Sequence, residues 1–304
     1  MLASRPQATP KMSTEVAMPP TDSISELAFS KTRDFLAASS WDNEDGSKLA
    51  SGGADNIAQV LDMVTGTQTE FGVHEAPIKS VRWLDEHNIV ATGSWDKTIK
   101  YWDLRSRSPV STMALSSRCH SIDTHDALLV CATMDNFVTV YDLTNPTVAL
   151  RAYQATKMQI RVVSCFTQGV AGYAVGLVEG RTLIEYAQDK DQNRKFGFKC
   201  HRYRDDIYAV NSIAFHPVHG TFGTAGSDGS VAFWDKDTKQ RISDGFIPKQ
   251  DAPITATAFN STGSIYAYAV SYDWSKGYAG APKNYNDTIK LALFARDDLK
   301  PKKK

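Results

Sequence analysis

Short runs of apolar and β-branched residues recur along this chain, and most of them end on an aromatic or apolar residue followed by an acid. The clearest is Thr98-Ile-Lys-Tyr-Trp-Asp103, and Ser230-Val-Ala-Phe-Trp-Asp235 repeats it in the second half. Related runs end near Asp62, Asp103, Asp142, Tyr186, Asp235 and Phe294. Short runs that alternate in polarity predict strands, because successive side chains of a strand point to opposite faces. We therefore expect an all-β protein.

A turn with an acidic residue precedes five of these runs. The turn acids are Asp55, Asp96, Asp135, Glu179 and Asp228, which lie 39 to 49 residues apart. A period of about 40 to 45 residues that closes on a Trp-Asp dipeptide is typical of a WD40 β-propeller. Small residues before the turns, as in Gly93-Ser94 and Ala225-Gly226, allow neighbouring blades to approach closely. The pattern therefore predicts a WD40 β-propeller.

The number of predicted strands differs between the strand types. Seven second strands begin near Leu36, Leu49, Val90, Leu129, Tyr173, Phe222 and Ile265, but inner and third strands number six each. Trp41-Asp42 closes one second strand, and another begins at Gly46. About 35 residues of a repeat are therefore missing near residue 43. We expect a propeller of nominally seven blades, with one blade unit largely deleted between the first and second repeats. A splice variant, a gene-model error and true divergence would all give this pattern.

Histidines precede two of the predicted inner strands, at His74 and His201. In this repeat such a histidine bonds with the turn acid and the strand tryptophan, and so fixes the blade. The alternative is a catalytic His–Asp pair, but no cluster of acids, bases or metal ligands recurs at compatible positions. The spacing His216-Pro-Val-His219 follows a strand, where two solvated imidazoles are expected. We predict no enzymatic activity, no cofactor and no metal site.

Composition restricts the partners only weakly. The chain has 34 basic and 34 acidic residues, so no whole-molecule field attracts nucleic acid or anionic lipid. No apolar run approaches the roughly 18 residues that span a bilayer, and no membrane insertion is expected. The four cysteines lack CxxC spacing and are expected to be buried thiols. We predict a disordered tail over residues 1–22, the propeller over 23–295 and a basic tail over 296–304.

Several motifs exceed what a generic propeller needs. They are Glu179-Gly180-Arg181, Phe198-Lys-Cys-His-Arg202, Ser271-Tyr-Asp-Trp-Ser-Lys-Gly277 and the basic end Lys300–Lys304. Together they resemble the WD-repeat mRNA export family of the Gle or RAE type. The first two motifs are shared with a sister family, the Bub-type propeller of the mitotic checkpoint. The stretch 271–277, the Pro-Pro-Thr-Asp-Ser-Ile segment at 19–24 and the basic tail favour the export family.

The resemblance implies a partner. Members of this family bind a short helical-hairpin segment of an FG-nucleoporin, the GLEBS motif, across the top face of the propeller. Transferred to this chain, Arg181 and Arg202 would bind the paired glutamates of GLEBS, and Trp41 and Trp95 would be apolar anchors. Two local alternatives stay open: Trp95 caps its own turn, and Arg181 pairs with a nearby glutamate.

The resemblance also implies contact with RNA. A basic, aromatic surface of this family is thought to contact single-stranded RNA, and here it would comprise Tyr272, Trp274, Lys276 and Lys283. Alternatively the loop only helps to hold the nucleoporin, and Trp274 covers the central channel.

These features predict a non-enzymatic adaptor in the nucleus, at the nuclear pore of the nuclear envelope and shuttling to the cytoplasm, that supports export of mRNA–protein particles. The alternative is a spindle-checkpoint scaffold that binds the GLEBS segment of a checkpoint kinase, with microtubule or checkpoint proteins as partners.

Overall fold

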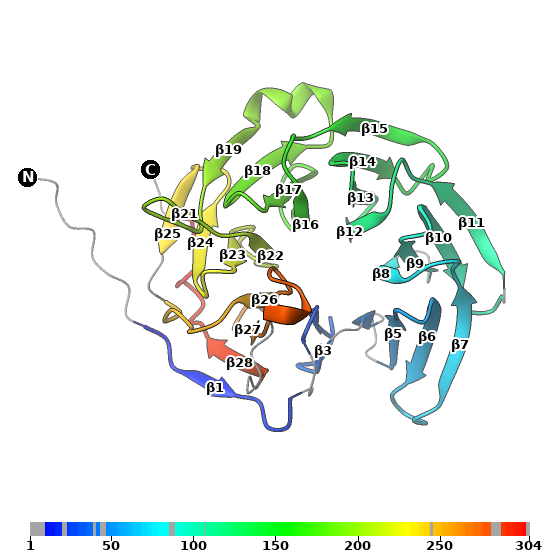
Figure 1. The fold of residues 1–304 in the computed structure, drawn as a ribbon, viewed down its shortest axis with the longest axis horizontal. Coiled ribbons are helices and arrows are strands. Elements are labelled where there is room, and N and C mark those ends of the chain that lie inside the picture. The colour runs from blue at the N-terminus through cyan, green and yellow to red at the C-terminus, as the bar shows by residue number, and fades with distance from the viewer. Residues whose placement is uncertain are drawn as a thin grey trace, which may run out of the picture.

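Antiparallel strands that pair with their neighbours in sequence account for most of the regular structure in the computed structural model (Figure 1). The structure describes residues 10–19, 23–38, 41–42, 47–84, 89–106, 108–243, 246–280 and 287–301. Within these ranges the side chains of residues 41, 42 and 243 are not described. The prediction of an all-β protein is confirmed.

Six sheets have four strands each and form the blades of a propeller. Blade 1 contains β4 (Trp41–Asp42), β5 (Lys48–Gly52), β6 (Ile57–Asp62) and β7 (Gln68–Val73). Blade 2 contains β8 (Ile78–Leu84), β9 (Ile89–Ser94), β10 (Thr98–Asp103) and β11 (Pro109–Ala114). Blade 3 contains β12 (Cys119–His125), β13 (Leu128–Thr133), β14 (Phe137–Asp142) and β15 (Ala149–Gln154).

The second half of the chain continues the ring. Blade 4 contains β16 (Ile160–Cys165), β17 (Gly172–Leu177), β18 (Arg181–Tyr186) and β19 (Phe196–Lys199), with the 3-10 helix η2 (Asp189–Arg194) between its last two strands. Blade 5 contains β22 (Val210–Phe215), β23 (Phe222–Gly226), β24 (Val231–Asp235) and β25 (Gln240–Ser243). Blade 6 contains β26 (Ile254–Phe259), β27 (Ile265–Val270), β28 (Thr288–Leu293) and β1 (Ser13–Glu15). A second 3-10 helix, η3 (Tyr278–Gly280), lies in the loop between β27 and β28.

The predicted number of blades is wrong. The part of the chain that the structure describes forms six blades, not seven with one unit deleted. The error comes from Trp41-Asp42, which the sequence pattern placed at the end of a second strand. Their backbone instead pairs with Ala50 and Leu49, so β4 is the innermost strand of blade 1 and completes that blade.

A two-stranded hairpin lies between blade 6 and blade 1 (Figure 1). It consists of β2 (Leu27–Phe29) and β3 (Leu36–Ala38). Its β2 strand contacts β26 of blade 6 and β4 of blade 1. Leu27 is buried, and Phe29, Leu36 and Ala38 pack against the apolar residues of blade 6. The hairpin therefore bridges the last blade to the first.

Segments near both ends of the described part of the chain pack against the propeller. Residues 13–15 form β1, the outer strand of blade 6, and Tyr268 Oη donates a hydrogen bond to Ser13 Oγ at 2.8 Å. The expected tail over 1–22 therefore has to be shortened, because β28 has an edge that β1 fills. At the other end Leu299 is buried, and its carbonyl accepts a hydrogen bond from Thr221 Oγ1 at 2.9 Å. The expected basic tail thus begins within a packed segment.

Apolar residues of adjacent blades form the core between the sheets. Val138 and Val140 of blade 3 pack with Val163 and Val175 of blade 4, all of them fully buried. Glycine is required where blades approach most closely, because a Cβ on Gly93 would lie 2.3 Å from Cδ1 of Ile122 in the next blade. The role of small residues before the turns, expected from the sequence, is confirmed at this position.

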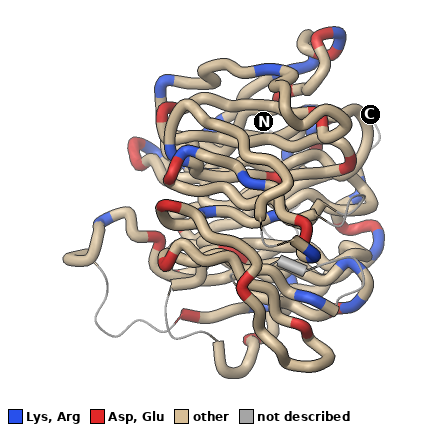
Figure 2. Tube along the Cα trace, turned by 90° about the vertical axis from the view of Figure 1, so that its right-hand side faces the viewer, with Lys and Arg blue, Asp and Glu red and all other residues tan. Residues whose placement is uncertain are grey.

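Charged residues of both signs are interspersed along the trace (Figure 2). This distribution agrees with the formal net charge of zero. Among the described residues, no helix is long and apolar enough to span a membrane.

Candidate functional site

One end of the propeller collects the segments on which the sequence analysis placed its candidate residues. Strands alternate in direction within a blade, so the turns from second to third strands and the connections between blades lie at the same end. We call this end the top face. It includes Trp95 between β9 and β10, Arg181 at the start of β18 and the loop after β27. It also includes Arg202 in the small hairpin of β20 (Arg202–Tyr203) and β21 (Asp206–Ile207).

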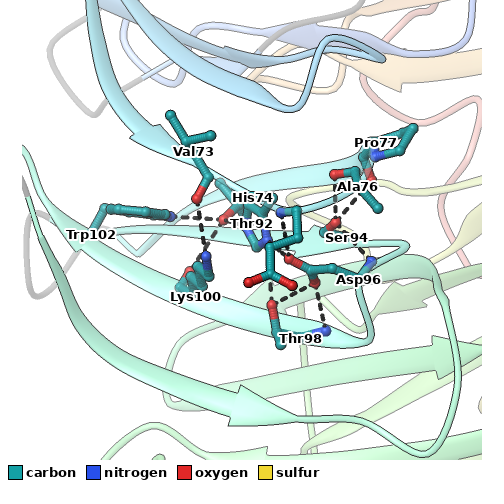
Figure 3. A network of polar contacts seen from close by, with 11 residues as sticks. Val73, His74, Ala76, Pro77, Thr92, Ser94, Asp96, Thr98, Lys100 and Trp102 are labelled. Carbon is teal, nitrogen blue, oxygen red and sulfur yellow. Dashed lines mark hydrogen bonds and ion pairs between the residues drawn. The ribbon is translucent and has the colours of Figure 1, made fainter.

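A buried polar network holds the turn that carries Trp95 (Figure 3). His74 Nδ1 lies 2.7 Å from the Asp96 carboxylate, and His74 Nε2 lies 2.6 Å from Thr92 Oγ1. The indole N–H of Trp102 donates to the same Thr92 oxygen at 2.8 Å. A neutral imidazole satisfies this geometry by donating from Nδ1 and accepting at Nε2. The network therefore connects the turn acid to the strand tryptophan.

The same arrangement recurs in blade 5, where His201 contacts Asp228 at 2.9 Å and Thr224 at 3.0 Å. The expected structural role of His74 and His201 is confirmed, since these hydrogen bonds occupy both ring nitrogens. Burial lowers the pKa of His74, and the neighbouring Asp96 opposes that shift. Burial raises the pKa of Asp96, but hydrogen bonds from Thr98 and His74 outweigh it and the pKa is lowered overall.

Trp95 projects from this fixed turn. Its backbone N–H donates to the carbonyl of Pro77 at 2.9 Å, while its side chain is 41% exposed. The guanidinium of Arg118 lies 5.6 Å from the centre of the indole ring. The side chain is thus a positioned, accessible aromatic group with a cation beside it, as an interface anchor requires.

Arg181 and Arg202 both lie beside Glu179. Arg202 Nε donates to the carbonyl oxygen of Glu179 at 2.9 Å, so much of this guanidinium supports the turn before β18. Arg181 Nε lies 3.6 Å from the Glu179 carboxylate but forms no hydrogen bond to any described residue. Of the two predicted glutamate readers, Arg181 has the more available guanidinium, and its local pairing with Glu179 is the alternative that the sequence left open.

The loop after β27 is attached to the propeller by a buried carboxylate and exposes aromatic side chains to solvent. Asp273 is buried; its carboxylate accepts hydrogen bonds from Ser227 Oγ at 2.5 Å and from the Ser275 N–H at 3.1 Å. Trp274 has a positive φ of 58° and is 49% exposed. Its ring lies 5.7 Å from that of Tyr272, whose hydroxyl donates to the Gly277 carbonyl. The loop therefore presents two neighbouring rings at fixed positions.

Of the three remaining predicted site residues, one is fully described and two have no described side chain. Lys276 lies in the same loop, where its backbone N–H donates to the Tyr272 hydroxyl at 3.2 Å. Lys283 lies outside the described residues. The backbone of Trp41 forms part of β4, but its side chain is not described. The structure therefore brings Trp95, Tyr272 and Trp274 together around the mouth of one central cavity, with Arg181 and Arg202 elsewhere on the same face.

Sequence reasoning missed several exposed apolar groups on this face. Met134 precedes the turn acid of blade 3 as Trp95 does in blade 2, and its side chain is 42% exposed. Met158 lies in the connection to blade 4, and Tyr203 and Ile207 lie on the hairpin β20–β21; all three are exposed. Alignment of the repeats on their turn acids could have identified Met134. The hairpin gave no such signal, because its residues fall outside the repeat.

The structure offers no candidate metal centre among the described residues, where no group of three or more potential ligands occurs. The four cysteines are free and buried, as expected. The prediction of two solvated imidazoles at His216 and His219 is wrong. His216 is buried, and its Nδ1 accepts hydrogen bonds from the N–H groups of Val218 and His219, both at 3.1 Å. The imidazole is thus the acceptor that this turn requires.

Replacement of Thr92 by valine should destabilise the propeller. The change removes the oxygen that satisfies both Trp102 and His74, and each unsatisfied buried group costs about 1–3 kcal/mol. We expect a loss of about 2–4 kcal/mol in the free energy of unfolding, measured by urea titration. The exposed Thr112→Val variant is the matched control. Equal stability of the two variants would contradict the role of the network.

Stability should fall as the pH is lowered from neutrality. Burial lowers the pKa of both His120 and His216 from 6.5 to about 4, so the folded state favours the neutral rings. Between these values the unfolded chain binds more protons, and the stabilisation present above pH 6.5 is lost toward pH 4. Urea midpoints at several pH values in this window measure the effect. His216→Gln should flatten the dependence, whereas the exposed Thr112→Val variant, which changes no titratable group, should leave it unchanged.

Comparison with known proteins identifies close relatives over nearly the whole chain. The family model "WD domain, G-beta repeat" matches residues 66–103 and 193–235. The mRNA export factor GLE2 of Chaetomium thermophilum is 42% identical, with 96% of this chain and 93% of the relative aligned. The Poly(A)+ RNA export protein of Schizosaccharomyces pombe is 41% identical, with 97% and 94% aligned. Protein Rae1 of Drosophila melanogaster is 36% identical, with 97% and 98% aligned.

A solved structure supports the fold alone. The structure of U3-55K superimposes with a TM-score of 0.79 over 94% of this chain and 100% of that chain, at 12% identity. The alignment with the Chaetomium protein extends over 335 positions, more than the 304 residues of this chain. That relative therefore has residues without a counterpart here.

Proposed function

This chain belongs to the WD-repeat family of mRNA export factors, and from that premise we propose that it is a non-enzymatic adaptor of the nuclear pore. Its partner would be the GLEBS segment of an FG-nucleoporin. The relatives imply a role in nucleocytoplasmic mRNA export; the pore location and the nucleoporin are our proposal. The observation that carries it is the collection of exposed aromatic and cationic side chains on one face of a rigid propeller.

The chemistry of this face suits an acidic amphipathic segment. Trp95 and Met134 offer accessible apolar surface at equivalent places in adjacent blades. Arg181 offers a guanidinium that can bind a carboxylate with two hydrogen bonds. Because Glu179 lies 3.6 Å from Arg181, a glutamate of the partner would compete with an intramolecular one. We expect the partner carboxylate to prevail where the complex excludes water and Glu179 can turn toward solvent.

RNA is the second proposed partner. Tyr272 and Trp274 form a fixed pair of rings on which bases can stack, and Lys276 supplies a cation in the same loop. A site of this kind would bind single strands without strong sequence preference. It would allow the adaptor to contact messenger RNA while the nucleoporin holds it at the pore.

An adaptor role also agrees with the use of the polar groups. The two His–Asp pairs hydrogen-bond to threonines inside the blades, so they support the fold. The described acids that line the central cavity, Glu26, Asp123 and Asp273, have their own partners. Among these described groups no nucleophile has an adjacent base.

A pulldown with two GLEBS peptides tests the proposed partner against the checkpoint alternative. One peptide comes from an FG-nucleoporin and the other from a checkpoint kinase. We expect preferential capture by the nucleoporin peptide, because the chain aligns with mRNA export factors over nearly its full length. Stronger capture by the kinase peptide would favour the checkpoint scaffold, and capture by neither would contradict both proposals.

The variant Arg181→Glu tests the site. Reversal of this charge beside Glu179 should weaken binding of the nucleoporin peptide by about 2–5 kcal/mol, because the partner carboxylate then meets two acids. Isothermal titration calorimetry gives the affinity, and thermal unfolding confirms that the propeller is intact. Lys190→Glu, on the exposed helix η2, makes the same charge change at a distance and should bind normally. Unchanged affinity of the Arg181 variant would remove this residue from the interface.

A further inference from the structure

The central cavity has a volume of about 760 Å³, within the range of small-molecule sites. The innermost strands of the blades line it, and the top-face residues Trp95, Tyr272 and Trp274 lie at its mouth. A site for a partner's surface residues does not require such depth. The cavity is therefore a second feature of this face, and it shares only Trp95 with the proposed nucleoporin surface.

A β-bulge recurs in the innermost strands of five blades and changes the direction of one side chain in each of them. In blades 2 to 6 the pairing register shifts between the first and third residues of the innermost strand, which leaves the second residue as a β-bulge. Bulges of this kind change the direction of a side chain and are frequent at functional sites. The bulged residues are Lys79, His120, Arg161, Asn211 and Thr255, and all five line the cavity. They form one layer, which we call the bulge layer.

The charge of the bulge layer is concentrated on three adjacent blades. Lys79, His120 and Arg161 come from β8, β12 and β16, which contact one another in that order. The pKa of His120 reflects this proximity. Burial is the larger cause that lowers it, the two neighbouring cations lower it further, and the result is a pKa of about 4. The imidazole is therefore neutral at physiological pH. Its buried Nδ1 has no hydrogen-bond partner among the described residues.

The two cations keep unused hydrogen-bonding capacity. Toward the described residues Arg161 donates from Nη2 alone, to Asn211 Oδ1 at 3.2 Å and to the Asp273 carbonyl at 3.4 Å. Lys79 is exposed, and its ammonium forms no hydrogen bond or ion pair with any described residue. The nearby acids are already engaged, because Arg82 binds both Glu26 and Asp123, and Ser227 donates to Asp273. Arg161 also lowers the pKa of the nearby Asp273 carboxylate, which accepts hydrogen bonds from Ser227 and Ser275. Among the described residues no carboxylate forms a direct ion pair with Lys79 or Arg161, so the layer keeps a surplus of positive charge.

We propose that the bulge layer binds the phosphate of a small aromatic phosphate, of the size and chemistry of a nucleoside monophosphate. Lys79 and the free N–H groups of Arg161 would contact the phosphate. The ring of the ligand would lie against Trp274 or Trp95 at the cavity mouth, where both indoles are accessible. None of the bulged residues belongs to the proposed nucleoporin surface, so the phosphate contacts do not depend on that partner. The aromatic part rests on the proposed function, because it uses Trp274 of the RNA surface and Trp95 of the nucleoporin surface.

Calorimetric titration of the full chain with AMP, adenosine and inorganic phosphate tests the site. We expect AMP to bind at least about tenfold more tightly than either fragment, since only AMP engages both the cations and an indole. Lys79→Gln should weaken AMP about tenfold and leave adenosine unchanged, because a phosphate contact is lost. Trp274→Leu should weaken AMP without changing the affinity for phosphate. The matched control is Lys97→Gln, an exposed lysine of the β9–β10 turn that does not line the cavity.

Each result decides the proposal. Absence of AMP binding at millimolar concentration, or equal binding by the Lys79 and Lys97 variants, would overturn it. Equal affinity for AMP and inorganic phosphate would overturn the aromatic part and leave an anion site. Displacement of AMP by a 5′-phosphorylated tetranucleotide at equal affinity would support the site and assign it to the end of a strand. Retention of nucleoporin peptide binding by Lys79→Gln would separate this site from the adaptor surface.

Discussion

The burial of both faces of each sheet against its neighbours is the constraint on which this molecule depends. A four-stranded blade has two apolar faces, and only a closed ring covers both of them on every blade. Val90 and Trp102 show the satisfied case: they lie at 0% and 2% exposure between blade 2 and blade 1. Leu49 and Leu61, at the equivalent places of blade 1, are only partly buried because a two-stranded hairpin precedes that blade. These two residues of blade 1 are therefore less completely covered than their equivalents in blade 2.

The packing of neighbouring blades also makes the top face rigid. The turn that carries Trp95 and the equivalent turn of blade 5 at Ser227 are fixed because His74 and His201 connect them to threonines inside the blades. The loop after β27 is fixed differently, through the buried Asp273 carboxylate and its bond from Ser227 of the adjacent blade. Both sets of hydrogen bonds hold exposed aromatic side chains in place before a partner binds, so these side chains need not become ordered during binding. Preorganisation of this kind reduces the entropic cost of association.

The periodic residues allowed the fold to be predicted. The Trp-Asp dipeptides, the turn acids and the preceding histidines recur at similar spacing, and each has one structural role that the hydrogen bonds bear out. The prediction failed where the repeat was interrupted, at Trp41-Asp42, because a two-residue strand and the end of a longer strand look alike in sequence. It failed again at His216, where a turn needed an acceptor for two N–H groups.

The sequence by itself determined the architecture of repeated antiparallel strands and the family, because both depend on local patterns and on motifs of a few residues. It also indicated that Trp95, Tyr272 and Trp274 lie in top-face loops, but it was wrong for Trp41, whose backbone lies in β4. The tertiary structure alone decided that β1 completes the last blade, that β4 completes the first and that Arg202 supports a turn beside Glu179. It alone gathered Lys79, His120 and Arg161 into one layer. These residues are about 40 positions apart, and only the closure of the ring brings them together.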